Sequence, residues 1–348
     1  MWESRPTQRR GPLFSVPYTI AIQLVNWRIM YLAIEIGGTK LQMGIGTGEG
    51  GPLTVLRRTT VEPTSGASGI CRQITQLGAK LIREYDVAAV GIGFGGPVDP
   101  SQGTVIKSHQ IEGWEGFPLV SWAESSLGRP VCLGNDADMA GLGEALFGAG
   151  RGQRVVLYSN VGSGIGGALV LDGQLFLGGS GGAQEIGHLR PGLHADTAEH
   201  TVESLASGWG MTQAAIASLQ GISGAEEADA VSDLLKRCGG DTNRLNTKML
   251  ADAMASGNRL ASDVFQQGIC AYGWALAQAI TLTGPNVVVV GGGVALVGEE
   301  LYLIPLRREI ERYVFPPRLG TYHVKGAELG EEVVLHGALA LAKNRARV

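Results

Sequence analysis

The sequence predicts a two-domain α/β protein with a cleft between the domains, on the basis of three observations. The chain has 348 residues, which exceeds the length at which one hydrophobic core usually divides into two. Apolar runs with the character of strands alternate with segments of helical periodicity. A succession of hairpin, strand, helix, strand and helix occurs in both halves of the chain.

The first half opens with a predicted hairpin. Residues 31–36 form an apolar, β-like run that ends at a glycine turn and resumes over residues 41–46. Apolar side chains then recur at helical spacing, at Ile70, Ile74 and Leu77 among others. The remaining elements expected in this half are a strand at 53–60, a helix at 67–85, strands at 87–94 and 131–133, and a helix at 135–147.

The second half begins with a strand at 154–159, a tight turn and a strand at 168–171 that ends in an Asp172-Gly173 hairpin turn. Helices are expected to dominate from residue 203 to residue 282. A fully apolar, parallel-type strand follows at 287–290 and leads into three glycines. The last predicted element is a helix at 298–313.

The composition describes a folded protein of balanced charge. Hydrophobic residues make up 44% of the chain, the net charge is −4, and 54 residues are glycine. These values exclude a disordered or fibrous chain, and the absence of a basic stripe argues against a nucleic-acid partner. The four cysteines form no CxxC pair, so we expect reduced, buried thiols and a cytoplasmic location.

Residues 1–29 form an unusual leader. Their uncharged part contains Pro12 and Pro17 and lacks a small-residue cleavage site, which argues against a signal peptide. It is also too short and too mixed to span a bilayer, so no membrane partner is expected. Because Met30 directly precedes the first strand, we expect translation to start there naturally and residues 1–29 to be a poorly ordered extension.

Two glycine stretches, which begin at Gly91 and Gly162, match the spacing of a dinucleotide-binding fingerprint. That fingerprint needs a helix directly after the glycines, so that the helix N-terminus can face a pyrophosphate. The first stretch is followed by Pro97 and the second by the strand at 168–171. Neither context supplies the helix, so a nicotinamide-dependent dehydrogenase is disfavoured.

A polar set follows the second glycine stretch. Glu185, His188 and Glu203 carry groups that can hold sugar hydroxyls, because a carboxylate accepts hydrogen bonds and a neutral imidazole both donates and accepts them. The bare amides of the preceding glycine turn favour phosphate oxygens. A sugar site beside a nucleotide site suggests a sugar kinase.

Several further motifs occur in a fixed order along the chain. They are Gly37-Gly38-Thr39-Lys40, Gly95-Gly96-Pro97-Val98-Asp99, Gly113-Trp114-Glu115-Gly116, Asn135-Asp136-Ala137, Gly162-Ser163-Gly164-Ile165-Gly166-Gly167, Glu185-Ile186-Gly187-His188, Glu203-Ser204-Leu205-Ala206-Ser207-Gly208 and Gly291-Gly292-Gly293. From about Met30 to its C-terminus the chain resembles the ROK group of sugar kinases and repressors. Repressors of that group carry an N-terminal helix-turn-helix domain of many tens of residues, for which this chain shows no pattern, so the kinase branch is favoured.

The resemblance implies the two-domain fold of the actin-like ATPases, which is ribonuclease H-like and has a cleft between its domains. Residues 30–135 together with about 333–348 would form the smaller α/β domain. Residues 136–332 would form the larger α/β domain, with a helical insertion.

The same resemblance makes Asp136 the expected catalytic residue. In the family pattern the aspartate after asparagine accepts the proton of the attacking sugar hydroxyl, a role that suits a carboxylate. Spacing alone leaves an alternative, in which Asn135 or Asp136 only caps the helix that follows. Asp138 is expected to face solvent.

Binding roles also follow from the resemblance. For nucleotide they fall on Gly37, Gly38, Thr39 and Lys40 in one phosphate turn, Gly162, Ser163 and Gly164 in a second, and Gly291, Gly292 and Gly293 on the adenosine side. For sugar they fall on Gly95, Gly96, Gln110, Asn135, Asp136, Glu185, His188 and Glu203. ATP and Mg²⁺ are the expected cofactors.

Three departures from the family pattern concern the expected metal, phosphate and sugar sites. Glu35 stands where the family usually has aspartate, at a position expected to orient metal-bound water, and Mg²⁺ demands near-ideal octahedral geometry. Ser163 replaces a threonine and keeps its hydroxyl. Gln110 replaces an asparagine that contacts sugar hydroxyls, which leaves the identity of the hexose open.

A fourth departure concerns zinc. Family members usually follow the histidine with a loop of three cysteines, whereas the corresponding positions here are His194, Asp196 and Thr201. Together with His188 and His200 the remaining ligands form a permissible set with unproven spacing. We expect a loop held by ordinary hydrogen bonds and no structural zinc.

The sequence therefore predicts an ATP-dependent hexose kinase that phosphorylates a 6-hydroxyl, with glucose as the first candidate. Kinases for N-acetylmannosamine, N-acetylglucosamine or fructose use the same polar set and stay open. A second class, a sugar-binding protein with impaired catalysis, rests on Glu35 and the missing cysteines. The resemblance also implies a homodimer.

Overall fold

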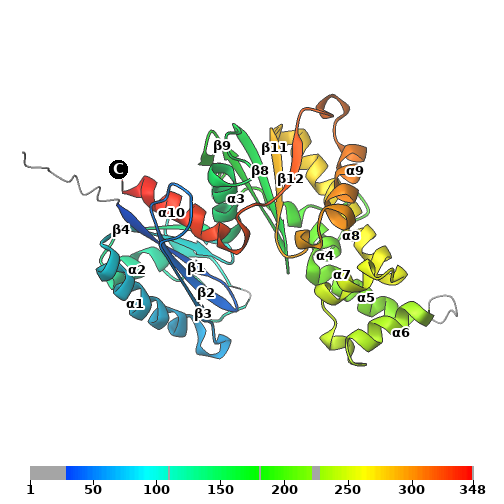
Figure 1. Cartoon of the computed structure of the whole chain (residues 1–348), viewed down its shortest axis with the longest axis horizontal. Helices are drawn as coiled ribbons and strands as arrows, with labels where there is room; N and C mark the ends of the chain where they lie inside the picture. Colours follow the sequence, from blue (N-terminus) through cyan, green and yellow to red (C-terminus); the bar gives the residue numbers. More distant parts are fainter. Residues whose placement is uncertain (1–28, 109, 180–181, 222–227, 347–348) are drawn as a thin grey trace, which may run out of the picture.

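The computed structural model describes residues 29–108, 110–179, 182–221 and 228–346. The expected N-terminal extension, apart from Ile29, lies outside these ranges. Two five-stranded sheets organise the fold, with strand orders β3-β2-β1-β4-β7 and β10-β9-β8-β11-β12. Figure 1 shows them side by side with helices between and around them. The mixed α/β class with two related sheets confirms the fold class predicted from the sequence.

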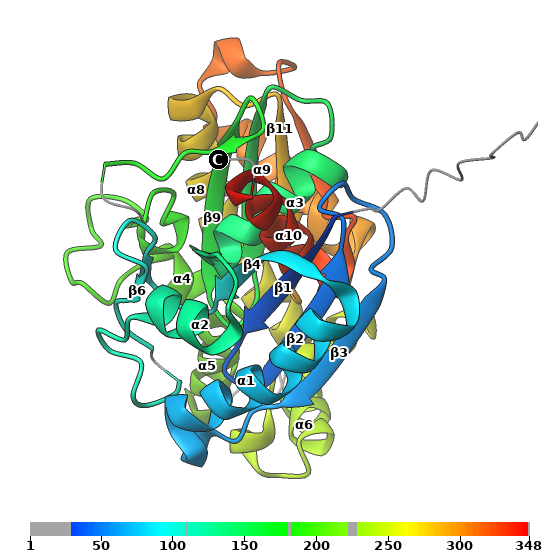
Figure 2. The same cartoon turned by 90° about the vertical axis from the view of Figure 1, so that its left-hand side faces the viewer.

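The first sheet begins with the predicted hairpin, since β1 pairs antiparallel with β2 and parallel with β4. Helices α1 and α2 cover one face of this sheet, toward the viewer in Figure 2. A short hairpin of β5 and β6 follows β4. The elements are β1 (Met30–Ile36), β2 (Lys40–Gly46), β3 (Val55–Thr60), α1 (Gly66–Tyr85), β4 (Val87–Phe94), β5 (Val98–Asp99), β6 (Thr104–Val105), α2 (Leu119–Leu127) and β7 (Val131–Asn135).

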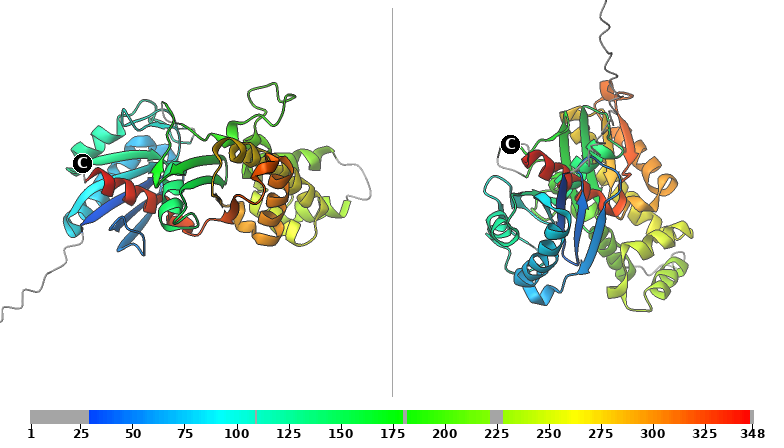
Figure 3. Two further views of the ribbon diagram at one scale, coloured as in Figure 1. Left: turned by 90° about the horizontal axis from the view of Figure 1, so that it is seen from above. Right: turned by 60° about the vertical axis from the view of Figure 1, so that its left-hand side comes forward.

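The second sheet repeats this plan, because β8 pairs antiparallel with β9 and parallel with β11. A group of helices covers its outer face and extends away from the first sheet, as seen from above in Figure 3. The strands are β8 (Val155–Val161), β9 (Ile165–Leu171), β10 (Gln174–Leu175), β11 (Val287–Gly291) and β12 (His323–Gly326). The helices are α4 (Val202–Ala206), α5 (Gly208–Gly221), α6 (Ala228–Arg237), α7 (Thr247–Ala255), α8 (Arg259–Thr283) and α9 (Ile304–Tyr313), with a π-helical turn at Glu299–Leu303.

Two helices lie between the sheets, α3 (Asp136–Phe147) and α10 (Val333–Arg345). A shared hydrophobic core forms around them and takes side chains such as Ala33 of β1 and Val289 of β11. Alternate residues on the same strands face the outer cores instead, as Ile34 does. This alternation follows from the two-residue period of a strand. Because each sheet packs against a core on either side, both of its faces are buried.

Most predicted elements are confirmed within a few residues, and the misses have physical reasons. The sequence reading found no helix at α10 or α2 and no strand at β12. Helix α10 is buried on nearly all sides, so it shows no apolar stripe at helical period. Strand β12 is a short edge strand with mostly polar, accessible side chains, which removes the alternation that signals a strand.

The cysteines match the expectation in part. All four are free, and Cys71 and Cys238 are buried like small hydrophobic residues. Cys132 and Cys270 are only partly buried, so the expectation of four buried thiols is wrong for these two. Within the described ranges, no helix combines the length and apolar character needed to cross a membrane.

Candidate active site

The junction of β7 and α3 is built around Asn135. Its side-chain oxygen accepts a hydrogen bond from the backbone N–H of Ala137 at 2.8 Å, which caps α3. Its side-chain amide donates to the backbone oxygen of Gly96 at 2.9 Å. Asn135 therefore caps the helix, as one reading of the sequence held, and also ties the helix start to the turn after β4.

Asp136 is the first residue of α3 and lies against the turn after β4. Its Oδ1 accepts a hydrogen bond from the Ala137 amide at 2.8 Å. A methyl group placed on Gly95 would lie 3.4 Å from its Oδ2, so this oxygen lies beside the glycine backbone of the turn. Burial raises the pKa of Asp136 to about 6, and the charges of Glu35 and Glu185 add to the rise. A carboxylate with this pKa is well suited to accept a proton near neutral pH.

Asp138 does not face solvent, so that expectation is wrong. The residue is only 8% exposed, because the first turn of α3 is enclosed between the two sheets and the second residue after Asp136 points to the opposite side of the helix. Burial, with the charges of Glu185 and Asp136, raises the pKa of Asp138 to about 7. A second titratable carboxyl, that of Asp138, thus lies close to the carboxyl of Asp136 on the same helix.

Glu35 lies near the end of β1 and has partners on the neighbouring strand. The Gln42 side-chain amide donates to its Oε2 at 2.8 Å, and Lys40 Nζ lies 3.8 Å from its Oε1. Arg58 Nε donates to the Gln42 oxygen at 2.6 Å and so fixes the orientation of that amide. Burial is the main cause of the raised pKa of Glu35, which Lys40 and Gln42 oppose.

The first glycine turn connects β1 to β2. The Gly37 amide donates to the Lys40 carbonyl at 3.0 Å and closes the turn. The side chain of Gln110 lies directly over Gly38, where no Cβ would fit. A residue predicted for sugar and a residue predicted for phosphate are therefore in contact, and Thr39 between Gly38 and β2 is exposed.

The second glycine turn connects β8 to β9 in the same way. The Gly162 amide donates to the Gly164 carbonyl at 2.8 Å, and the Gly162 carbonyl accepts from the Gly208 amide at 2.7 Å. Oε2 of Glu203 accepts a hydrogen bond from the backbone N–H of Ile165 at 2.7 Å. Ser163 at the tip of the turn is exposed, so its hydroxyl is available to a ligand.

Glu185 precedes a short 3₁₀ turn at Ile186–His188 and His188 ends it, and both side chains are accessible from outside. Partial removal from water raises the pKa of the Glu185 carboxyl, Glu203 raises it further, and His188 opposes the rise. The electrostatic influence of Glu185 also reaches Asp136. These charged groups are therefore close enough in space to influence one another.

The third glycine stretch follows β11 and lies beside the second turn. Gly292 has φ of +88° and packs on the backbone of Val161, which leaves no room for a side chain. The Val294 amide donates to the Val161 carbonyl at 3.0 Å. Gly291 lies against the ring of Tyr158, and Gly293 is exposed with open space in front of it.

The loop from Gly192 to Thr201 is held by hydrogen bonds. Thr201 caps α4 in a reciprocal capping box with Ser204, in which each side chain accepts from the other residue's amide at 3.2 Å. Arg190 donates to the Ala195 carbonyl at 3.3 Å. Within the described ranges, no group of three histidine, cysteine or carboxylate side chains is arranged to hold a metal ion.

The residues present fit a magnesium nucleotide. Open space lies in front of Gly162 and Gly293, where an added methyl group would meet nothing within 4 Å, so a phosphate oxygen can approach the backbone there. Glu35 and Asp136 lie close enough for their charges to interact. One or two carboxylates are the number that Mg²⁺ takes from a protein when substrate phosphates supply other ligands.

Sequence reasoning missed Gln42 and Arg58, the residues that orient Glu35. A signal for them was present in the predicted hairpin. A tight turn between residues 36 and 41 fixes the register, and Glu35 pairs with Gln42 directly across the two strands. The next strand then places Arg58 opposite Gln42.

Comparison with known proteins agrees with this arrangement. The ROK family profile matches residues 31–345. A glucokinase from Thermotoga maritima is 30% identical over 324 residues, which covers 91% of this chain and 98% of the relative. The structure of a ROK family glucokinase from Streptomyces griseus in complex with glucose and AMPPNP is 30% identical with a TM-score of 0.75, covering 90% of this chain and 99% of that one. A ROK hexokinase from Thermus thermophilus is 28% identical with a TM-score of 0.76, covering 92% and 99%. The chain therefore belongs to the ROK family and has the actin-like ATPase fold of its sugar kinases.

Proposed function

We propose that this protein is an ATP-dependent hexose kinase that phosphorylates the 6-hydroxyl of its sugar. The observation that carries the proposal is the position of Asp136. Its Oδ2 lies beside Gly95, and burial raises its pKa, with further contributions from Glu35 and from Glu185 of the predicted sugar residues. A general base must lie between the two substrates, and the influence of these two carboxylates on Asp136 supports that position.

In the proposed reaction Asp136 accepts the proton of the 6-hydroxyl while the hydroxyl oxygen forms a bond to the terminal phosphorus of ATP. The bond from that phosphorus to its bridging oxygen breaks, and ADP leaves with the electron pair. Asp136 later releases its proton to solvent. When bound, Mg²⁺ neutralises charge on the phosphates.

The other residues position the reactants. Backbone amides of the turns at Gly37 and Gly162 would bind phosphate oxygens, and Glu35, whose carboxylate Gln42 holds, would help to hold Mg²⁺ through water. Glu185, Glu203 and His188 accept and donate hydrogen bonds to the sugar hydroxyls. This arrangement supplies proximity and charge stabilisation, which account for most of the catalysis of phosphoryl transfer.

Glucose is our first candidate for the sugar. It is supported by the 30% identity to a relative named glucokinase and to a solved glucokinase that binds glucose. Gln110, which lies over Gly38, differs from the asparagine of the family pattern. N-acetylmannosamine, N-acetylglucosamine and fructose therefore remain alternative substrates of the same proposal.

A coupled assay of ADP release, with ATP and a panel of hexoses and N-acetylhexosamines, tests both points. We expect phosphorylation of at least one hexose, with the highest kcat/KM for glucose. A preference for another sugar would change the proposed substrate but would still support the proposed kinase activity. Absence of ADP release with every sugar, in protein that binds glucose by calorimetry, would favour the sugar-binding alternative.

That alternative rests on Glu35, whose side chain is one methylene longer than the usual aspartate. Its hydrogen bond to Gln42 and its proximity to Lys40 show a supported carboxylate rather than a displaced one. The presence of Asp136 at the junction of the two sites also favours catalysis. We propose further that the protein acts as a homodimer, which analytical ultracentrifugation would test.

A further inference from the structure

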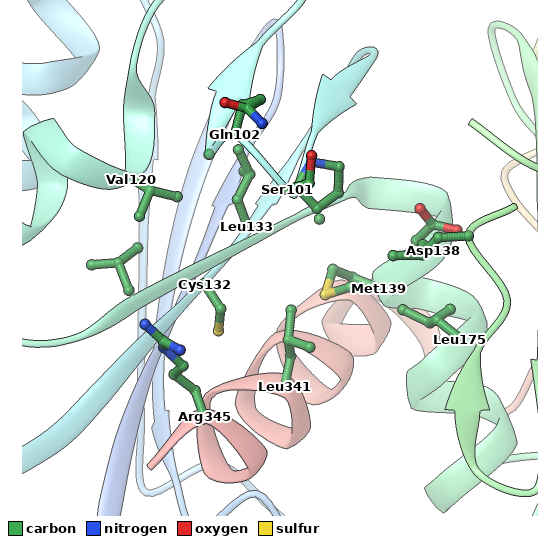
Figure 4. A pocket seen from close by; sticks show the side chains of 15 residues that line it. Ser101, Gln102, Val120, Cys132, Leu133, Asp138, Met139, Leu175, Leu341 and Arg345 are labelled. Atoms are coloured by element: carbon green, nitrogen blue, oxygen red, sulfur yellow. The ribbon is translucent and has the colours of Figure 1, made fainter. Parts of the chain in front are cut away.

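A second cavity lies beside the proposed active site. It has a volume of about 420 Å³ and takes its lining from both sheets and from the helices between them. Figure 4 shows its walls, which include Cys132 and Leu133 of β7, Met139 of α3, Leu175 of β10 and Leu341 of α10. This size falls in the range of pockets that enclose small organic ligands.

One wall of this cavity carries the buried carboxyl of Asp138. Within the described residues no hydrogen bond or ion pair reaches that side chain, although it is only 8% exposed. Its oxygens are not among the fully buried side-chain atoms without a partner, so they keep accessible surface that a ligand group in the cavity could contact. Figure 4 shows the carboxyl of Asp138 at one end of the pocket, where a ligand group can reach it.

The opposite end carries Arg345, from the last turn of α10. Figure 4 shows its guanidinium beside Cys132, well apart from Asp138. Arg345 is exposed, and in the part of the chain that the structure describes its guanidinium has no ion pair. Between the two charged ends the lining is mostly apolar, with Leu133, Met139 and Leu341 in the middle.

The geometry points to a binding site for an elongated small molecule with an ammonium group at one end, an apolar middle and a carboxylate at the other. The ammonium group would bind Asp138, the carboxylate would bind Arg345, and the apolar part would cover Leu133 and Leu341. Charge-assisted hydrogen bonds of this kind are about twice as strong as neutral ones.

This site is separate from the one proposed for hexose. Asp138 lies two residues after Asp136 and so points to the other side of α3. Among the described residues that line the cavity, none belongs to the three glycine turns or to the predicted sugar set. The inference therefore stands apart from the kinase proposal.

A series of ω-aminocarboxylates of increasing chain length provides the probes. Binding to the full-length protein is measured by calorimetry without nucleotide or hexose, so the result does not depend on kinase activity. We expect one chain length to bind best, because it matches the separation of the two charged ends. Alkylamines and alkyl carboxylates of the same length lack one charge and are expected to bind about tenfold more weakly or worse.

Three variants test the location. Asp138→Asn and Arg345→Gln are each expected to weaken binding of the best probe about tenfold or more, and Leu175→Trp to abolish it by filling the cavity. Asp252→Asn and Arg259→Gln, which alter exposed charges on α7 and α8, are controls expected to leave binding unchanged. Circular dichroism confirms that each variant is folded. Failure of every chain length to bind, or binding that these variants do not weaken, would overturn the inference.

Discussion

The carboxylate of Glu203 accepts a hydrogen bond from the backbone amide of Ile165 at 2.7 Å, so a residue predicted for sugar binding holds the second phosphate turn. A methyl group on Gly164 would lie only 2.7 Å from the same carboxylate oxygen, which shows how closely the two segments pack. Glu203 therefore connects the residues predicted to bind sugar with the glycine turn predicted to bind phosphate. Glu185 has no comparable contact to a glycine turn among the described residues.

Because of this difference, substitutions of Glu203 and Glu185 are expected to affect the KM values for hexose and ATP differently. Glu203→Gln is expected to raise the KM for hexose and also the KM for ATP, because the amide weakens the charge-assisted bond to Ile165. Glu185→Ala is expected to raise only the KM for hexose, since leaving a hydroxyl of the bound sugar without its hydrogen-bond partner costs about 1–3 kcal/mol. Steady-state kinetics with each substrate varied in turn would measure both. Equal effects of the two variants on both constants would contradict the distinction.

Asp136→Asn is expected to lower kcat by about 10²-fold or more while sugar affinity stays nearly intact. Because the pKa of Asp136 is about 6, the wild-type kcat/KM should fall as pH drops through that value, where the base becomes protonated. The residual kcat/KM of the variant should not fall over this acidic pH range. Turnover close to wild type in Asp136→Asn would remove the residue from the mechanism.

Gln42→Leu should make the enzyme require more Mg²⁺. The change removes the hydrogen bond that orients Glu35 and the acceptor for Arg58, and loss of such supporting contacts typically weakens a metal site by about 10–100-fold. Half-maximal activity would be measured against Mg²⁺ at saturating hexose. Arg57→Ala is the control, because Arg57 is exposed and, among the described residues, donates a hydrogen bond only to the neighbouring Leu56 carbonyl. An unchanged Mg²⁺ requirement in Gln42→Leu would show that Glu35 does not act through the metal.

Glu144→Gln should lower the free energy of unfolding by about 2–4 kcal/mol. This buried carboxylate accepts hydrogen bonds from the amides of Ala149, Glu328 and Leu329 at 2.8–2.9 Å, so it joins the end of α3 to the segment that leads into α10. An amide in its place turns one acceptor into a donor that faces N–H groups. Urea unfolding of this variant, with Glu300→Gln at an exposed site as control, would measure the loss. Equal stability of the two variants would contradict the assignment.

Zinc is expected to be absent from the loop between Gly192 and Thr201. Thr201 and Ser204 hold the end of that loop through a capping box. We therefore predict less than stoichiometric zinc by elemental analysis, and unchanged hexose phosphorylation after EDTA once Mg²⁺ is restored in excess. One zinc per chain, lost together with activity on chelation, would reverse this prediction and make His188, His194, Asp196 and His200 candidate ligands.

The sequence predicted most of the fold and the composition of the candidate site. Apolar runs at strand period and glycine turns located the hairpin of β1 and β2, and the order of motifs identified the family. The sequence did not predict helix α10, because burial on nearly all sides removes the apolar stripe of helical period. It also did not predict the burial of Asp138, because part of its surroundings comes from β10, which is distant in sequence. Local periodicity carries no record of contacts that distant segments supply.

The sequence by itself determined the strands, the glycine turns and the types of polar group available to hexose and phosphate, because these depend on local spacing and side-chain chemistry. Only the tertiary structure decided which groups meet. It placed Glu203 on the second phosphate turn, Gln42 on Glu35 and Asp138 in a cavity between the sheets. It also set the pKa of Asp136, since burial and the charges of distant residues, not the side chain alone, fix the balance between its two protonation states.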